Sequence, residues 1–279
     1  MNDGSLAIRD VTVRFGGLTA LDGISLTAAP RQITGIIGPN GAGKTTLLNT
    51  ACGFVKPQAG TVSFDGRVLT GLRTHRLAAL GIARTLQGVG LFPGLTVAEN
   101  VMIGATPGAR AGVWSALFGL PRSDRDERRL RQLALDALDR LGVADLADRR
   151  PDTLSYGLRK RVALARALAA QPRLILLDQP ASGLPENGLP ELGNLIRDLT
   201  TEAGVVVIEH RMDLVMSVCD TIFVLDFGKL IASGPPAEIQ VNPAVTAAYL
   251  GADGTTEPGT PGTGAADTGI PEAGEATDD

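Results

Sequence analysis

The sequence predicts an α/β fold with a mainly parallel sheet, and three stretches carry this prediction. A glycine-rich loop, residues 38–45, stands between a short apolar stretch and a helical one. Further along the chain, residues 174–177 and 204–208 are continuous apolar runs, and each leads into polar residues, the first into Asp178 and the second into Glu209 and His210. Strands that are buried on both faces of a parallel sheet have this uninterrupted apolar pattern, and helices connect them.

Residues 38–45 read Gly-Pro-Asn-Gly-Ala-Gly-Lys-Thr and match the phosphate-loop pattern at every fixed position. Gln32 to Ile37 before the loop predicts a strand and Thr45 to Ala51 after it predicts a helix, so a chance glycine-rich turn is disfavoured. Lys44 would contact the β and γ phosphates of a nucleoside triphosphate, and Thr45 would offer a hydroxyl to Mg²⁺. The candidate nucleotide-binding residues here are Gly38, Asn40, Gly41, Gly43, Lys44, Thr45 and Thr46.

An antiparallel sheet is expected in the first part of the chain. Apolar and polar residues alternate over Leu6 to Phe15 and Ile24 to Ala28, with turns predicted at Gly16-Gly17 and Asp22-Gly23. Residues 61–64 alternate again and extend this sheet. Phe15 at the strand end could stack on a nucleotide base or fill the core, because its ring suits both roles.

The middle of the chain is predicted to be helical. Thr96 and Glu99 form a capping box that opens a helix to about Ile103, and a second helix runs from Ser123 to about Leu141. Apolar residues in the insertion between them, residues 105–121, suit either core packing or partner docking. Gln87 is either an ordinary polar loop residue or a group that reaches a metal ion or water beside the γ-phosphate.

Three further polar positions open or follow predicted elements. Ser155 is a natural N-cap and, with Gly157, gives a second anion site at a helix N-terminus. Asp178 ends an apolar strand, and we expect it to hold Mg²⁺ opposite Thr45 rather than to cap a helix. His210 follows another apolar strand at the same edge. A lone His is usually structural, but here an imidazole could donate a hydrogen bond to the γ-phosphate.

Composition and charge exclude several classes of protein. No apolar run approaches the roughly 18 residues of a membrane span, and the N-terminus lacks a secretory pattern, so a cytosolic chain is expected. Cys52 and Cys219 lack the spacing of a zinc or redox site and are interpreted as core residues. Arginines in residues 122–131 alternate with acidic residues, which indicates a solvated helix face and no nucleic-acid surface. Residues 251–279 are acidic and rich in Gly, Pro and Thr, so a disordered tail is expected.

In their order and spacing, the phosphate loop, the Ser-Gly helix start and the strand ending in Asp178 resemble the nucleotide-binding subunit of an ATP-binding cassette (ABC) transporter. The resemblance covers about residues 6–250 as one ABC ATPase domain. It implies a P-loop NTPase core with an N-terminal antiparallel β subdomain and an α-helical subdomain at about 88–165. It also implies individual roles: Phe15 stacks on the base, Gln87 is the Q-loop residue, residues 154–158 the signature motif, Asp178 the Walker B carboxylate, residues 182–185 the D-loop and His210 the switch histidine.

Within that family, several segments resemble the ATPase subunits of branched-chain amino acid importers: residues 9–26, 81–87, 91–100, 154–157, 209–212 and 248–251. Such subunits bind ATP with Mg²⁺ and pair as homodimers or heterodimers that close on two ATPs. The resemblance therefore implies a second ATPase subunit and transmembrane permease subunits as partners, and an external solute-binding protein indirectly. It implies a peripheral location at the cytoplasmic face of the membrane.

Three positions depart from the family pattern. Gln179 stands in place of the catalytic Glu, Leu158 in place of the signature's final Gln, and Pro185 in place of the D-loop's usual Asp or Asn. A glutamine amide has the shape of the acid but cannot accept a proton, so we expect nucleotide binding to survive better than hydrolysis. Gln179 is either an introduced substitution or a naturally degenerate site with a competent partner. The catalytic candidates are Gln179, His210 and Gln87, and the metal-binding candidates are Thr45, Gln87 and Asp178.

Two other functions and other cargoes stay open. An ABC ATPase acting on DNA or the ribosome usually carries long coiled coils or two fused cassettes, and neither pattern occurs here. A nucleotide-dependent binding module with little turnover is supported by Gln179. Urea, lipid or lipopolysaccharide remain alternative cargoes, because the ATPase subunit never touches the cargo.

Overall fold

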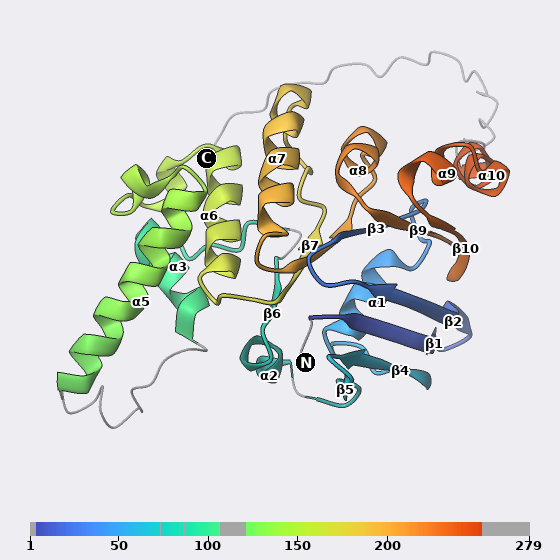
Figure 1. Cartoon of the computed structure of the whole chain (residues 1–279), viewed down its shortest axis with the longest axis horizontal. Helices are drawn as coiled ribbons and strands as arrows, with labels where there is room; N and C mark the ends of the chain where they lie inside the picture. Colours follow the sequence, from blue (N-terminus) through green and yellow to red (C-terminus); the bar gives the residue numbers. More distant parts are fainter. Residues whose placement is uncertain (1–3, 73, 86–87, 107–120, 253–279) are drawn as a thin grey trace, which may run out of the picture.

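The part of the chain that the structure describes forms two β-sheets, with helices on both faces of the larger one (Figure 1). The structure, a computed structural model, describes residues 4–72, 74–85, 88–106 and 121–252. The smaller sheet has the order β2-β1-β4-β5 and the larger one the order β10-β9-β3-β8-β7-β6. The strands are β1 (Leu6–Phe15), β2 (Leu18–Ala28), β3 (Ile33–Ile37), β4 (Ala59–Phe64), β5 (Arg67–Val68), β6 (Ile82–Arg84), β7 (Leu174–Asp178), β8 (Gly204–Ile208), β9 (Thr221–Asp226) and β10 (Lys229–Gly234).

The smaller sheet is antiparallel, as the alternating pattern predicts. β1 pairs with β2 on one side and with β4 on the other. The predicted turn at Asp22-Gly23 is wrong, because β2 continues through both residues. Val11 lies opposite Ile24 and Val13 opposite Leu21, so one extra residue of β2 is accommodated at this point. Gly23 has a φ of 62°, which a glycine adopts without strain, and the irregularity is a bulge instead of a turn.

The larger sheet is mainly parallel, which confirms the predicted fold class. β3 lies between β8 and β9 and is parallel to both, β7 is parallel to β8 and β6, and β10 is the antiparallel edge strand. Across this sheet Ile36 pairs with Ile208, and Ile208 pairs with Asp178. Because these strands are parallel, the chain segments that follow β3, β7 and β8 all leave the sheet at the carboxyl ends of the strands.

Three helices group at one end of the larger sheet, and the others pack along it (Figure 1). The group consists of α3, α5 and α6. Two of the three predicted helix starts in it are confirmed: Thr96 and Glu99 form the reciprocal capping box, and Ser155 caps α6 by accepting a hydrogen bond from Leu158 N. The third helix, α5, begins at Pro121, two residues before the predicted start at Ser123. The helices are α1 (Lys44–Ala51), α2 (His75–Ala79), α3 (Val97–Ala105), α5 (Pro121–Arg140), α6 (Tyr156–Leu168), α7 (Leu189–Leu199), α8 (Met212–Val218), α9 (Pro236–Gln240) and α10 (Pro243–Ala252). No helix among these is long and apolar enough to cross a membrane.

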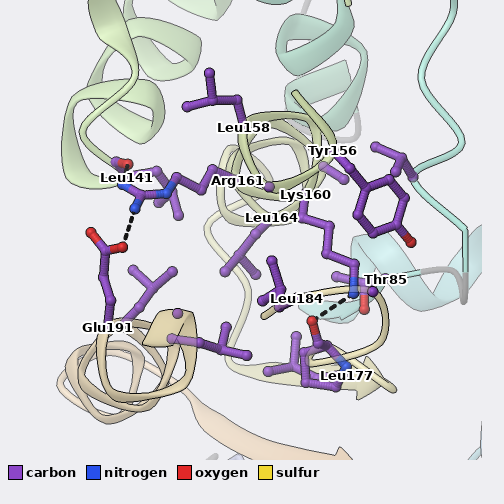
Figure 2. Close-up of a pocket in the computed structure, with 18 of the residues that line it drawn as sticks. Thr85, Leu141, Tyr156, Leu158, Lys160, Arg161, Leu164, Leu177, Leu184 and Glu191 are labelled. Carbon is purple, nitrogen blue, oxygen red and sulfur yellow. Dashed lines mark hydrogen bonds and ion pairs between the residues drawn. The ribbon is translucent and has the colours of Figure 1, made fainter. Parts of the chain in front are cut away.

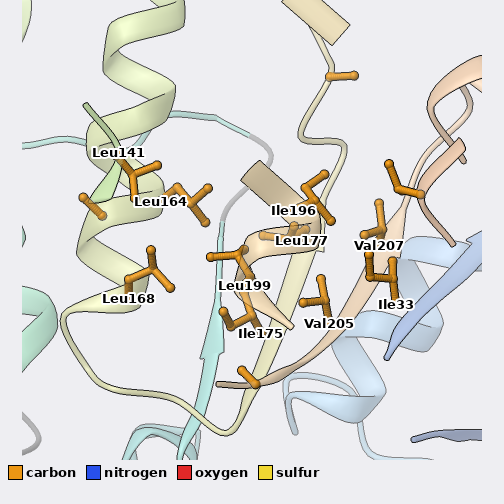
Figure 3. Packing of buried hydrophobic residues seen from close by; sticks show 14 of the residues in the cluster. Ile33, Leu141, Leu164, Leu168, Ile175, Leu177, Ile196, Leu199, Val205 and Val207 are labelled. Atoms are coloured by element: carbon orange, nitrogen blue, oxygen red, sulfur yellow. The ribbon is translucent and has the colours of Figure 1, made fainter. Parts of the chain in front are cut away.

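Alternate residues of the central strands fill two separate cores. Ile175 and Leu177 of β7 face the core that contains α5, α6 and α7, together with Val205 and Val207 of β8 (Figure 3). Their neighbours Leu174 and Leu176 face the opposite core, which contains α1 and the smaller sheet. The period of two places consecutive strand residues on opposite faces, and each fully buried aliphatic side chain contributes about 1.5–3 kcal/mol. Both faces of the larger sheet are thereby covered, and the polar segments emerge from strands that are packed on both sides.

Candidate functional site

The loop between β3 and α1 follows a course that only glycine permits at two positions. Gly38 and Gly43 have φ values of 147° and 101°. A Cβ on Gly38 would lie 2.0 Å from the carbonyl oxygen of Leu225, and one on Gly43 would lie 2.6 Å from that of Ala20. A side chain at either position would collide with these backbone carbonyl groups. Glycine at both positions therefore allows the loop to keep this course, in which backbone N–H groups can bind an anion.

Lys44 opens α1 and is turned toward the loop. Its Nζ donates hydrogen bonds to the carbonyl oxygens of Gly38 and Pro39, each at 2.7 Å. The side chain is buried, and this burial lowers the pKa of the ammonium. Contact with a phosphate would exchange the two carbonyl bonds for stronger charge-assisted ones, so this lysine is placed to respond to an anion in the loop.

Asp178, at the end of β7, is buried and paired with Arg84 at the end of β6. Arg84 Nη2 lies 3.0 Å from Asp178 Oδ2, and Arg84 Nη1 donates to Asn49 Oδ1 of α1 at 2.8 Å. The guanidinium also stands 5.6 Å from the centroid of the Phe54 ring. Reasoning from sequence missed Arg84. The sequence signal that could have identified it is a charged residue, Arg84, directly after the apolar residues that begin the short strand β6.

Gln179 directly follows Asp178 and has a φ of 50°, in the left-handed region. Its N donates to Ile208 O at 2.9 Å. Lys160 of α6 donates to the carbonyl oxygens of Gln179 and Pro180, at 3.4 and 2.7 Å. The helix α6, which Ser155 caps, is thus bonded to the backbone that carries Gln179. The left-handed Gln179 backbone is bonded through its N–H to β8 and through its carbonyl oxygen to Lys160 of α6.

The segment after β8 contains a fully buried carboxylate, that of Glu209. Its Oε1 accepts from Ala181 N at 2.6 Å, and its Oε2 accepts from His210 N at 3.0 Å. The His210 ring is more than half exposed, and its Nδ1 lies 3.6 Å from Glu209 Oε2. Sequence reasoning singled out His210 and passed over Glu209, although a charged residue at the end of an apolar run was the same signal that marked Asp178.

A cavity of about 770 Å³ lies between α6, α7 and the segments after β6 and β7. Ser155, Gly157, Asp178 and Gln179 all border it. Its walls include Leu158, Leu164, Leu177 and Leu184, and the ion pair of Arg161 with Glu191, 2.5 Å between Nη2 and Oε2, links α6 to α7 at its side (Figure 2). The candidate signature residues Ser155 and Gly157 and the candidate catalytic residue Gln179 therefore line the same cavity.

The structure describes the positions of most of the other predicted site residues. Asn40 and Gly41 are in the loop, Thr45 and Thr46 are in the first turn of α1, and Phe15 is half exposed at the end of β1. Gln87 lies outside the described residues. No group of three or more His, Cys, Asp or Glu in the described ranges could hold a metal ion alone. A hydroxyl and one carboxylate nevertheless suit Mg²⁺, which usually keeps waters and phosphate oxygens as further ligands.

Two family models match the chain. One, described as ABC transporter, matches residues 21–182, and the other, described as branched-chain amino acid ATP-binding cassette transporter, matches residues 229–255. The high-affinity branched-chain amino acid transport ATP-binding protein LivG of Salmonella typhimurium is 39% identical over 90% of this chain and 99% of its own length. BraF of Pseudomonas aeruginosa, which has the same description, is 39% identical over 88% and 97%.

Solved structures agree with these relatives. A nucleotide-free ATP-binding cassette from an ABC transporter superposes with a TM-score of 0.75 at 31% identity, covering 88% of this chain and 98% of the other. A cassette in its ADP conformation gives a TM-score of 0.76 at 31% identity, covering 89% and 99%.

Fold and sequence together define a P-loop ATPase of the ATP-binding cassette type. The chain belongs to the ABC transporter ATP-binding family, as an ATP-hydrolysing transport ATPase homologous to the ATPases of branched-chain amino acid importers.

Proposed function

We propose that this chain is the ATP-binding and hydrolysing subunit of an importer for branched-chain or related amino acids. The observation that carries the proposal is the similarity to LivG and BraF over about nine-tenths of the chain. The match of residues 229–255 to a branched-chain amino acid cassette model supports the same cargo. Urea or lipid remain alternative cargoes, since no residue described above contacts a transported molecule.

The proposed chemistry of the site is supported by the backbone course of the loop after β3 and by the position of Lys44. Its amides and the ammonium of Lys44 bind the β and γ phosphates, while Phe15 stacks on the base. Thr45 and Asp178 would hold Mg²⁺, and the bound ion would supply positive charge beside the phosphates. His210 donates a hydrogen bond toward the γ-phosphate. Gln87 and Thr46 complete the proposed site.

Hydrolysis by this chain is proposed to be slow. Gln179 stands where the family has a glutamate, and its amide can neither take a proton from the attacking water nor attract it with a full charge. Phosphate binding does not use this side chain, so affinity for ATP is retained. This difference supports the second candidate function, a nucleotide-dependent cassette whose turnover depends on a competent partner. A cassette that acts outside transport is a further alternative.

We propose that the chain works as half of a pair. Residues 1–250 form one cassette, with a helical subdomain at about 88–165 and a tail at 251–279. In the pair, Ser155 and Gly157 at the start of α6 contact the nucleotide held by the other cassette, because a helix N-terminus suits an anion. ATP-driven closure of the pair acts on transmembrane permease subunits at the cytoplasmic face of the membrane, and an external solute-binding protein delivers the cargo. The sister cassette is a second copy of this chain or a related subunit.

The nucleotide site is tested by Lys44→Ala in equilibrium binding of labelled MgATP. Loss of the ammonium leaves phosphate charges without their main side-chain partner, so binding should disappear. Lys56→Ala removes an exposed lysine a short distance along the chain and should bind normally. Normal affinity in the Lys44 variant would rule out this loop as the site.

The cargo is tested in membrane vesicles that contain this chain with its cognate permease subunits and solute-binding protein. ATP-dependent uptake of labelled leucine that is lost in the Lys44 variant supports the proposal. Uptake of urea or a lipid without uptake of leucine would contradict the cargo assignment and leave the ATPase assignment intact.

A further inference from the structure

The two proposed Mg²⁺ ligands stand on different secondary-structure elements. Thr45 is in the first turn of α1, whereas Asp178 is the last residue of β7. Mg²⁺ demands a near-octahedral set of oxygen ligands at about 2.0–2.1 Å and tolerates little deviation from it. A site made by these two residues therefore requires that the spacing between α1 and the end of β7 is held within narrow limits.

Two side chains form a bridge between these elements. Arg84, at the end of β6, donates from Nη1 to Asn49 Oδ1 of α1 at 2.8 Å and from Nη2 to Asp178 Oδ2 at 3.0 Å. Asn49 lies four residues after Thr45, so the two share one face of α1. The helix face that carries one proposed ligand is thus bonded, through a single guanidinium, to the carboxylate that is the other.

The bridge is rigid enough to set a spacing. A guanidinium is planar, and its nitrogens donate in fixed directions, so the two bonds of Arg84 fix the placement of both partners together. Its flat face stands 5.6 Å from the centroid of the Phe54 ring. The backbone N of Asp178 also donates to Thr85 Oγ1 of the next residue along, at 3.3 Å. The ion pair uses Oδ2 of Asp178, and a carboxylate has further lone pairs for a metal ion.

We propose that Asn49 is a positioning residue for Mg²⁺: through Arg84 it holds the Asp178 carboxylate at a fixed spacing from the turn of α1 that carries Thr45. The inference rests on the proposed Mg²⁺ site and deepens it, because it names the contact that sets the spacing of the two ligands. Loss of the Asn49 oxygen should impair the metal-dependent part of ATP binding and spare the part that comes from the phosphate loop.

The test is Asn49→Leu in the full chain, which keeps the size of the side chain and removes the acceptor. ATP affinity is measured with Mg²⁺, with Ca²⁺ and in EDTA. The gain in affinity from Mg²⁺ should fall by about three- to tenfold, below the 10- to 100-fold typical of a residue that contacts a metal ligand directly. The gain from Ca²⁺ should fall less, because Ca²⁺ accepts longer and less regular coordination. The affinity in EDTA should be unchanged.

Arg84→Lys is the second variant. It keeps a positive charge beside Asp178, but an ammonium lacks the planar fork that reaches two partners in fixed directions. It should show the same selective loss, and it decides the question if Asn49→Leu does not fold. Asn194→Leu is the matched control: Asn194 Oδ1 accepts from Arg197 Nη1 at 3.0 Å on the exposed side of α7, and its loss should leave all three affinities unchanged.

The outcomes separate this inference from the site on which it rests. A merely structural Asn49 would lower the melting temperature without nucleotide and leave the gain from Mg²⁺ unchanged, and that result would overturn the inference. Equal losses of affinity in Mg²⁺ and in EDTA would also overturn it. Unchanged gains in both variants, while Mg²⁺ strengthens ATP binding by the parent chain, would reject the bridge alone. No effect of Mg²⁺ on the parent chain would reject the proposed metal site and this inference with it.

Discussion

Arg84 and Asp178 form a buried ion pair that joins the ends of β6 and β7, and Asn49 extends it to α1. The side chains are 14% and 3% exposed. Because Arg84 precedes the segment that holds Gln87 and Asp178 is the proposed metal ligand, the pair connects two parts of the proposed site that are 94 residues apart in the chain. Such a pair fixes the carboxylate more than it stabilises the fold, since both charges lose water on burial.

Arg84→Met should lower the free energy of unfolding by about 3 kcal/mol, because it leaves the Asp178 carboxylate buried without its cation. Urea unfolding measures this change. Arg140→Met is the matched control: Arg140 pairs with Glu202 at 2.8 Å where both side chains are exposed, and its loss should cost less than about 1 kcal/mol. Equal effects of the two variants would mean that the buried pair is not held as the structure shows.

Gln179→Glu should raise the rate of phosphate release by about 10²- to 10⁴-fold, the usual range of a general-base effect. Glu has the same shape as Gln, so the αL backbone and the Lys160 bonds to the Gln179 and Pro180 carbonyls remain. Steady-state phosphate release is measured with the membrane subunits present. Gln179→Ala serves as the control, because it has neither the amide of Gln nor the carboxylate of Glu. Brisk hydrolysis by the parent chain, with no gain from Glu, would contradict the assignment. A small gain over a slow parent would point to Pro185 or Leu158 instead.

Removing residues 253–279 should leave the melting temperature and the MgATP affinity unchanged, since this acidic segment carries Ile270 as its only large apolar side chain. Removing residues 241–279 should lower the melting temperature by several degrees, because α10 then no longer buries Val245 and Tyr249. Thermal melts of the two truncated chains distinguish these outcomes. A clear loss in the shorter deletion would show that the tail docks.

Cys52 and Cys219 should not react with a thiol reagent in the folded protein at pH 8. Burial raises the pKa of Cys52 to about 11 and that of Cys219 to about 12. Since these values exceed the unfolded value of 9.0, the native state holds more protons above pH 9, and its stability falls as the pH rises from there toward the native values. Rapid labelling without denaturant would contradict the burial, whereas labelling of both thiols in denaturant is expected.

Local patterns predicted much of the fold. The capping box at Thr96, the Ser155 cap and the strand ending in Asp178 each depend on residues close together in sequence, and all three are present in the structure. The Asp22-Gly23 turn failed because the same dipeptide serves a turn or a bulge, and the pairing of β1 with β2 decides between them.

The parts of the candidate site that sequence reasoning missed depend on distant contacts. The functional importance of Arg84 comes from its ion pair with Asp178, and this pairing leaves no local pattern in the sequence. Glu209 was within reach, because its place after an apolar strand matches that of Asp178. The functional role was instead assigned to the adjacent His210, because an imidazole can donate a hydrogen bond to a phosphate.

The carboxylate of Glu209 has a mechanical consequence. One oxygen holds the amide of Ala181, two residues after Gln179, and the other holds the amide of His210. Both bonds converge on a side chain with no exposed surface, so neither segment can shift without straining the other. We therefore expect a displacement of the His210 backbone to move the backbone beside Gln179 as well, because the same carboxylate binds both segments.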